Sequence, residues 1–131
     1  MGKREDQRIR ILLEPGEEET ARAKVKPPGA IERQSAQLLS VVLTNRRLLI
    51  LGANAITMSS TGKLLLDLRL HQIETVSLTK RHSVMALGLP VVTLGIVPRD
   101  SDPIALESSG IGIGPLRKFG EALEAAVKSR T

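Results

Sequence analysis

The most informative segment of the chain is residues 40–52, where two apolar runs flank a short polar break. The first run ends at Leu43 and the second begins at Leu48, and both consist of the aliphatic residues expected in buried strands. Asn45 tolerates a positive φ, so Asn45 and Arg46 can turn the chain tightly between two antiparallel strands. We therefore expect a β-hairpin here and a fold built mainly from antiparallel strands.

Apolar periodicity predicts further strands on both sides of this hairpin. Residues 20–26 alternate strictly, with alanine and valine on one face and basic side chains on the other. The expected strands span residues 20–26, 37–44, 47–52, 63–70, 73–82, 91–97 and 104–108. Because these segments follow one another without intervening helices, the pattern argues against a parallel βαβ sheet.

A helix is expected at the C-terminus alone, near residues 115–130. Pro115 suits the first helical position. An apolar stripe at helical spacing follows it, formed by Leu116, Phe119, Leu123, Ala126 and Val127. Such a helix must bury its stripe, and the open end of a curved antiparallel sheet or barrel provides the place. The predicted fold class is mostly β, a β-barrel or bent antiparallel sheets of about seven strands, with one C-terminal α-helix.

The length of 131 residues fits one domain and suffices to bury a core. Residues 1–8 alternate charges without an apolar period, so we expect a mobile tail there and a single domain over residues 9–131. The longest apolar stretch, residues 84–97, is too short to span a bilayer, and no secretory signal is recognisable. We therefore expect a cytoplasmic protein that is at most peripheral to a membrane.

The composition excludes several classes of function. Aromatic residues make up 1% of the chain, so the base-stacking platform of single-stranded nucleic-acid binders is missing. The chain has no cysteine, which excludes disulfides, thiolate metal sites and cysteine nucleophiles. Its two histidines lack partners at metal-ligand spacing, and its serines lack a nucleophile-elbow context. We expect a protein that is not an enzyme and that holds neither a metal ion nor a cofactor.

Two further patterns resemble ligand sites but have structural explanations. Residues 110–114 read Gly-Ile-Gly-Ile-Gly before the expected helix, yet no βαβ unit surrounds them. We expect this segment to be a flexible link between strand and helix. Arg46 and Arg47 are adjacent and diverge, so we expect them to pair with Asp67 or Glu74 rather than to form an anion site.

The basic face of the first strand is the best candidate binding site. The net charge of +5 favours anionic partners in general. Arg22, Lys24 and Lys26 share one strand face at a spacing of about 7 Å, and Arg33 follows in the next loop. These four residues are candidates for binding an anion or a lipid headgroup, with an ordinary solvated strand face as the alternative.

A second candidate surface is the apolar loop that contains Met85, Leu87 and Leu89, beside Lys80 and Arg81. An apolar tip with a basic rim can dip into a membrane surface, and it can equally form a protein–protein interface. The alternative is that these side chains fold inward and belong to the core.

The order of the expected elements resembles the pleckstrin-homology (PH) fold, in which seven antiparallel strands are closed by a C-terminal helix. The hairpin residues 43–48, Leu-Thr-Asn-Arg-Arg-Leu, and the later residues 68–76 are similar to segments of bacterial PH-like and GRAM-like domains. The resemblance covers about residues 14–130. In phosphoinositide-binding PH domains, basic residues around the first loop hold phosphates, and Lys24, Lys26 and Arg33 match that pattern in part.

The resemblance implies a binding module rather than an enzyme. We expect it to mediate protein–protein interaction or self-association, through the apolar loop or an exposed sheet edge. The alternative is peripheral binding to anionic phospholipid or phosphoinositide membranes through the basic first strand. Nucleic acid is not an expected partner.

Overall fold

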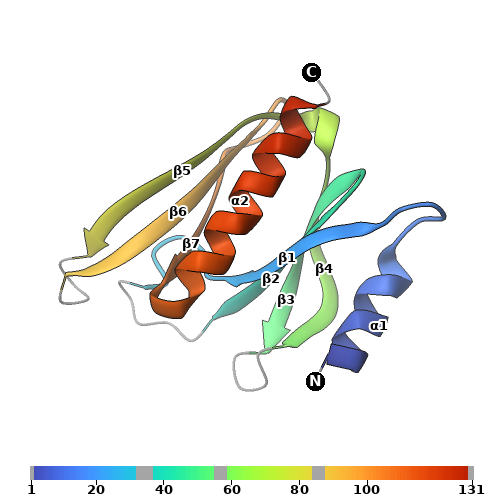
Figure 1. Ribbon diagram of the computed structural model, residues 1–131, viewed down its shortest axis with the longest axis horizontal. Coiled ribbons are helices and arrows are strands. Elements are labelled where there is room, and N and C mark those ends of the chain that lie inside the picture. The colour runs from blue at the N-terminus through green and yellow to red at the C-terminus, as the bar shows by residue number, and fades with distance from the viewer. Residues whose placement is uncertain (1, 32–36, 55–58, 84–87, 130–131) are drawn as a thin grey trace.

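The computed structural model describes residues 2–31, 37–54, 59–83 and 88–129, and these residues form two antiparallel sheets (Figure 1). The first sheet has the order β1–β2–β3–β4, with strands β1 (Glu19–Val25), β2 (Leu38–Thr44), β3 (Arg47–Asn54) and β4 (Ser59–Arg69). The second has the order β5–β6–β7, with strands β5 (Ile73–Ser83), β6 (Leu89–Pro98) and β7 (Ile104–Ser109). The predicted class, mostly β with a C-terminal helix, is confirmed as two sheets that do not close into a barrel.

The predicted hairpin is formed by β2 and β3. Leu43 lies opposite Leu48, and Asn45 and Arg46 connect the two strands. Alternate residues of the hairpin point to opposite faces, and both sets are buried. One set faces the core between the sheets and includes Val41, Leu43, Leu48 and Ile50. The other set faces the opposite side and consists of Val42, Leu49 and Leu51.

The C-terminal helix α2 (Ile113–Lys128) lies over the second sheet and reaches across to β1 (Figure 1). The predicted apolar stripe is buried as Leu116, Phe119, Leu123 and Val127. Gly120 lies in the same stripe, where an added Cβ would be 2.9 Å from Leu78 of β5, so the glycine permits close approach of helix and strand. Pro115 is the third residue of the helix rather than the first, still within the turn that tolerates proline.

A second helix, α1 (Gly2–Leu12), occupies the N-terminus. The expectation that the C-terminus alone would be helical is therefore wrong, since residues 2–8 of the expected tail belong to this helix. Ile9 of α1 is 1% exposed and packs against Val42, Leu49 and Leu51 on the outer face of the hairpin. The burial of Ile9 explains why a charged segment orders as a helix here.

A β-bulge in β4 changes which leucines of this strand face the core. Ile50 pairs with Leu66, but the next residue, Leu51, pairs with Leu64, so β4 contains one extra residue at this point. Leu68 is buried in the core between the sheets. Leu64 pairs with Leu51, so it lies on the outer face of the sheet with that residue, and it is 39% exposed.

Candidate functional site

The basic face of β1 forms as the alternation predicts. Ala23 and Val25 are buried in the core, while Arg22 and Lys24 point to the opposite face. Lys26 lies one residue beyond the strand, where its backbone forms an isolated β-bridge with β7. The structure therefore brings these three predicted cations together along one edge of the first sheet.

Of the other predicted site residues, Arg33, Met85 and Leu87 lie outside the described residues. Leu89 opens β6 and is 52% exposed. Of the three candidates in the predicted interaction loop, Leu89 is the one that the structure describes. The grouping of Arg33 with the β1 cations stays a prediction.

Carboxylates already pair with two of the cations of this face, Arg22 and Lys24. Arg22 lies 3.0 Å from Glu5 and 2.9 Å from Asp6, both on α1, and it also pairs with Glu19 of β1. Lys24 lies 3.0 Å from the same oxygen of Glu5. The hydrogen bond with Glu19 raises the pKa of Arg22, although its burial acts in the opposite direction. The helix α1 therefore contacts this basic face as an anionic partner would.

The hairpin motif carries a buried ionic network rather than a ligand site. Arg47 donates hydrogen bonds to Glu17 at 2.9 and 3.0 Å and to Asp67 at 2.7 Å. It also donates to the carbonyl oxygen of Leu12, at the end of α1, at 2.6 Å. The carboxylate of Glu17 accepts a further hydrogen bond of 2.6 Å from the hydroxyl of Thr44. The predicted pairing of Arg47 with Asp67 is confirmed. The guanidinium of Arg47 makes its hydrogen bonds within the protein, to Glu17, Asp67 and Leu12.

The acidic turn at residues 14–18 is held by the same hairpin and by β4. Glu14 accepts two hydrogen bonds from Arg69, at 2.8 and 2.7 Å, and these lower the pKa of Glu14 to about 2. Burial alone would raise the pKa of Glu17. Hydrogen bonds from Arg47 and Thr44 outweigh burial, so the pKa of Glu17 lies below its ordinary value of 4.5.

These two depressed pKa values predict acid sensitivity. A carboxylate with a depressed folded-state pKa stabilises the fold fully above its unfolded-state pKa and loses that contribution as the pH falls through the folded value. We expect the free energy of unfolding to fall as the pH drops from 4.5 toward about 2. Urea denaturation at a series of pH values measures this slope. A Glu17→Gln variant should show a shallower slope, and an unchanged slope would contradict the assignment.

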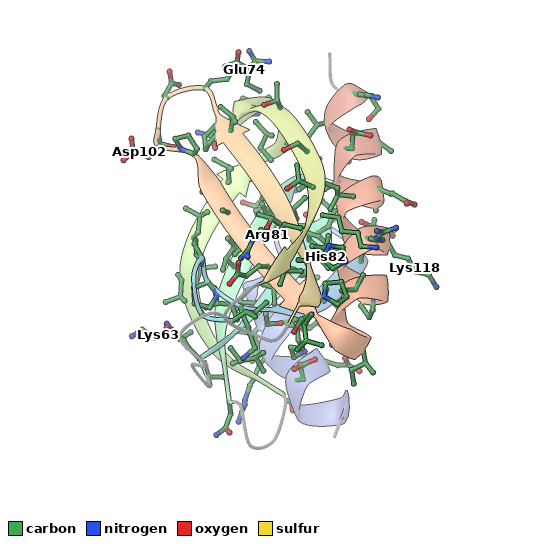
Figure 2. The ribbon with its side chains drawn as sticks, turned by 90° about the vertical axis from the view of Figure 1, so that its left-hand side faces the viewer. Lys63, Glu74, Arg81, His82, Asp102 and Lys118 are labelled. Carbon is green, nitrogen blue, oxygen red and sulfur yellow. The ribbon has the colours of Figure 1, made fainter. Side chains whose placement is uncertain are left out.

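A groove runs along the edge of β1 that does not pair with β2. Two adjoining hollows of about 510 and 430 Å³ form it, and both are lined by Arg22 and Pro115. We call this feature the β1 groove. Its apolar wall comes from β1, from α2 and from the connection before α2, and includes Val25, Ile111, Pro115, Phe119 and Ala122. Its cations are Arg22, Lys24, Lys26 and Lys118, the last projecting from α2 (Figure 2).

The backbone of β1 faces this groove because β1 is an edge strand. Lys26 and Glu107 exchange backbone hydrogen bonds of 2.8 and 2.9 Å across the gap between the sheets. Alternate residues of a strand direct their backbone groups to the same side, so those of Arg22 and Lys24 also point into the groove. The hydroxyl of Ser108 lies 3.5 Å from the carbonyl oxygen of Lys24, at the limit of a hydrogen bond. The groove is thus open along β1 and closed at the Lys26 end.

The closed end is fixed by the side chain of Glu107, which is almost fully buried. Its two oxygens accept hydrogen bonds from the backbone of Ile31 at 3.1 Å and from Arg81 at 3.2 Å. Figure 2 shows Arg81 on the second sheet, away from the end that carries Glu74 and Asp102. The bond from Ile31 holds the connection after β1 against β7, and the bond from Arg81 links β5 to β7 within the second sheet. The backbone bridge between Lys26 and Glu107 is what joins the two sheets at this end of the groove.

The sequence predicted three cations of the β1 groove, Arg22, Lys24 and Lys26, but neither Lys118 nor the apolar wall. Ile111 lies in the short 3-10 helix η2 (Gly110–Gly112), within the segment predicted to be a link, and it is 98% exposed. The signal available in the sequence was an isoleucine between two glycines in a connecting segment. A large apolar residue that stays exposed beside a groove indicates a binding surface.

The described residues contain no group of histidine, aspartate and glutamate side chains that could hold a metal ion. Among the described helices, none is both long and apolar enough to cross a membrane. A scan against models of known protein families gives no match, and a search of curated proteins gives no significant relative. The site's own geometry therefore carries the functional argument.

Proposed function

We propose that the protein is a non-catalytic binding module that holds a segment of a protein partner in the β1 groove. The observation that carries this proposal is that an open strand edge, an apolar wall and several cations line the same groove. Open strand edges bind extended segments through the backbone, and adjacent pockets select side chains. The two antiparallel sheets and α2 support a PH-like assignment, which is part of this proposal.

The edges of β4 and β5 are less suited to bind a partner, while β7 borders the same groove through Ser108 and Ser109. The β4 edge carries irregular register opposite β3, and Lys63 lies on that side of the molecule (Figure 2). Bulges and lysines are the usual devices that keep an edge strand from pairing. The β5 edge is bordered by α2, and the two hollows between them, about 220 and 160 Å³, are each smaller than either part of the β1 groove.

Binding to anionic phospholipid is the second candidate function. In its favour, Ile111 places an exposed apolar side chain beside the groove that Lys24 and Lys26 line. Against it, Glu5 is already paired with both Arg22 and Lys24, which reduces the positive charge that a membrane would meet. We expect little pelleting with phosphatidylserine vesicles. Salt-sensitive pelleting that is lost in a Lys24→Glu variant would favour the lipid function instead.

The proposed function is tested by selecting a phage-displayed library of random peptides on the wild-type protein. Enriched peptides are expected to bind about tenfold more weakly to an Ile111→Asp variant, because the charge replaces an apolar contact in the groove. Binding is measured by fluorescence anisotropy with the synthetic peptide.

Leu89→Asp is the matched control, because it changes another exposed apolar side chain that does not itself line the groove. Peptide binding to this variant should equal that of the wild type. Loss of binding in Leu89→Asp but not in Ile111→Asp would transfer the function to the predicted interaction loop. A selection that enriches no peptide would contradict binding of a protein segment.

A further inference from the structure

We infer that the β1 groove accepts an extended segment in which acidic and apolar residues alternate, added to β1 as a further strand. This inference rests on the proposed function and names the chemical class of the partner. It uses three observations: the backbone groups of Arg22 that face the groove, the cations on one side of β1, and the apolar wall on the other.

The two sides of β1 present different surfaces to an added strand. Side chains directly opposite each other in paired strands share a face of the sheet. Residues of the partner that lie opposite Arg22 and Lys24 therefore meet cations, and their spacing of about 7 Å matches every second residue of the partner. The intervening residues point toward the face that α2 covers, where Pro115, Phe119 and Ala122 line the groove.

The helix α1 shows that carboxylates fit these cations. One oxygen of Glu5 lies 3.0 Å from both Arg22 and Lys24, and Asp6 lies 2.9 Å from Arg22. Acidic residues of a partner would compete with these two carboxylates for the same cations. Neutralising Glu5 and Asp6 should therefore strengthen binding of an acidic segment.

The probe is the labelled peptide acetyl-Glu-Val-Glu-Val-Glu-Val-amide, with acetyl-Lys-Val-Lys-Val-Lys-Val-amide as its charge-reversed control. The acidic peptide is expected to bind at least about tenfold more tightly than the basic one. Two N-methylated forms of the acidic peptide test strand addition, one methylated on the glutamate amides and the other on the valine amides.

In an added strand, alternate amides pair with β1 and the others face outward. One methylated form is therefore expected to lose about tenfold in affinity while the other binds as the parent peptide does. Both forms carry the same charge and similar conformational restraints, so the difference between them reports backbone pairing. The form that loses affinity also identifies whether the added strand is parallel or antiparallel.

The competition is tested in a Glu5→Gln/Asp6→Asn variant, which is expected to bind the acidic peptide several-fold more tightly. The matched control is Glu74→Gln/Asp102→Asn, which makes the same charge change away from the groove, at one end of the second sheet (Figure 2). Circular dichroism checks that both variants keep the wild-type spectrum. Equal tightening in both variants would indicate a general charge effect and would overturn the competition.

Equal binding of the two methylated peptides would overturn strand addition. Equal binding of the acidic and basic peptides would overturn the preference for acidic residues. Either result would leave the proposed function intact if library peptides still lose affinity in Ile111→Asp. Loss of that Ile111 effect would remove the proposed function itself. Salt-sensitive binding to phosphatidylserine vesicles together with no binding of the acidic peptide would assign the cations to a membrane and overturn the inference.

Discussion

Replacing Arg47 with methionine is expected to lower the free energy of unfolding by about 3–5 kcal/mol, because it leaves a buried carboxylate without its partner. The side chain of Glu17 is 0% exposed, and Arg47 supplies two of its hydrogen bonds. The substitution also removes the hydrogen bond to the carbonyl oxygen of Leu12, which joins α1 to the hairpin. Urea denaturation followed by circular dichroism measures the loss.

Two control variants separate this mechanism from a general loss of charge. The double variant Arg47→Met/Glu17→Leu should be less destabilised than Arg47→Met alone, because it leaves no unpaired buried charge. Arg69→Met removes the two hydrogen bonds to Glu14 from an ion pair that is far more exposed, and it should cost much less stability. The single variant Glu17→Leu completes the comparison. If the double variant loses as much stability as Arg47→Met and Glu17→Leu lose in sum, the unpaired carboxylate is not the cause.

The hairpin and α2 could be predicted because residues close in the sequence specify each of them. Asn45 and Arg46 interrupt two aliphatic runs, and the stripe through Phe119 and Leu123 repeats at helical spacing. The bulge in β4 could not be predicted in the same way. Leucines occur at both Leu64 and Leu65, so either residue fits an apolar pattern, and the register against β3 decides which face each one takes.

The helix α1 was missed because the signal for it lies outside its own sequence. Its segment is mostly charged, and an isolated helix of this length is marginally stable in water. The hairpin, however, is apolar on both faces, with Val41 buried on one side and Val42 on the other. Continuous apolar runs are typical of strands covered on both faces, so the hairpin itself required a second covering layer.

Only part of the candidate site could be predicted, because the rest of it depends on contacts between elements that are distant in the sequence. Alternation along one strand identified Arg22 and Lys24, but their ion pairs with Glu5 depend on the position of α1. The apolar wall forms because η2 and the first turns of α2 lie beside the edge of β1. Their position depends on how the second sheet is joined to β1 through the bridge between Lys26 and Glu107. Periodicity within single elements carries no information about either arrangement.

The packing of α1 on the hairpin also holds Glu5 against the cations of the β1 groove. Substitution of Ile9 tests both effects. An Ile9→Ala variant is expected to lose about 2–5 kcal/mol of unfolding free energy, because it opens a cavity in a fully buried cluster. Ile9 is 1% exposed and is the α1 residue that is buried against Val42, Leu49 and Leu51. Weaker docking of α1 would also free Arg22 and Lys24 from Glu5, so peptide affinity should rise as stability falls.

The same helix provides the control for this prediction, since Ile11 lies two residues further on and is 76% exposed. Ile11→Ala removes the same atoms from the same helix and should change the unfolding free energy by less than about 0.5 kcal/mol. The two variants are compared by urea denaturation and by anisotropy with the acidic peptide. Equal stability of both variants would show that α1 does not stabilise the hairpin. A loss of stability in Ile9→Ala without a gain in peptide affinity would mean that α1 covers the hairpin but does not compete for the cations of the β1 groove.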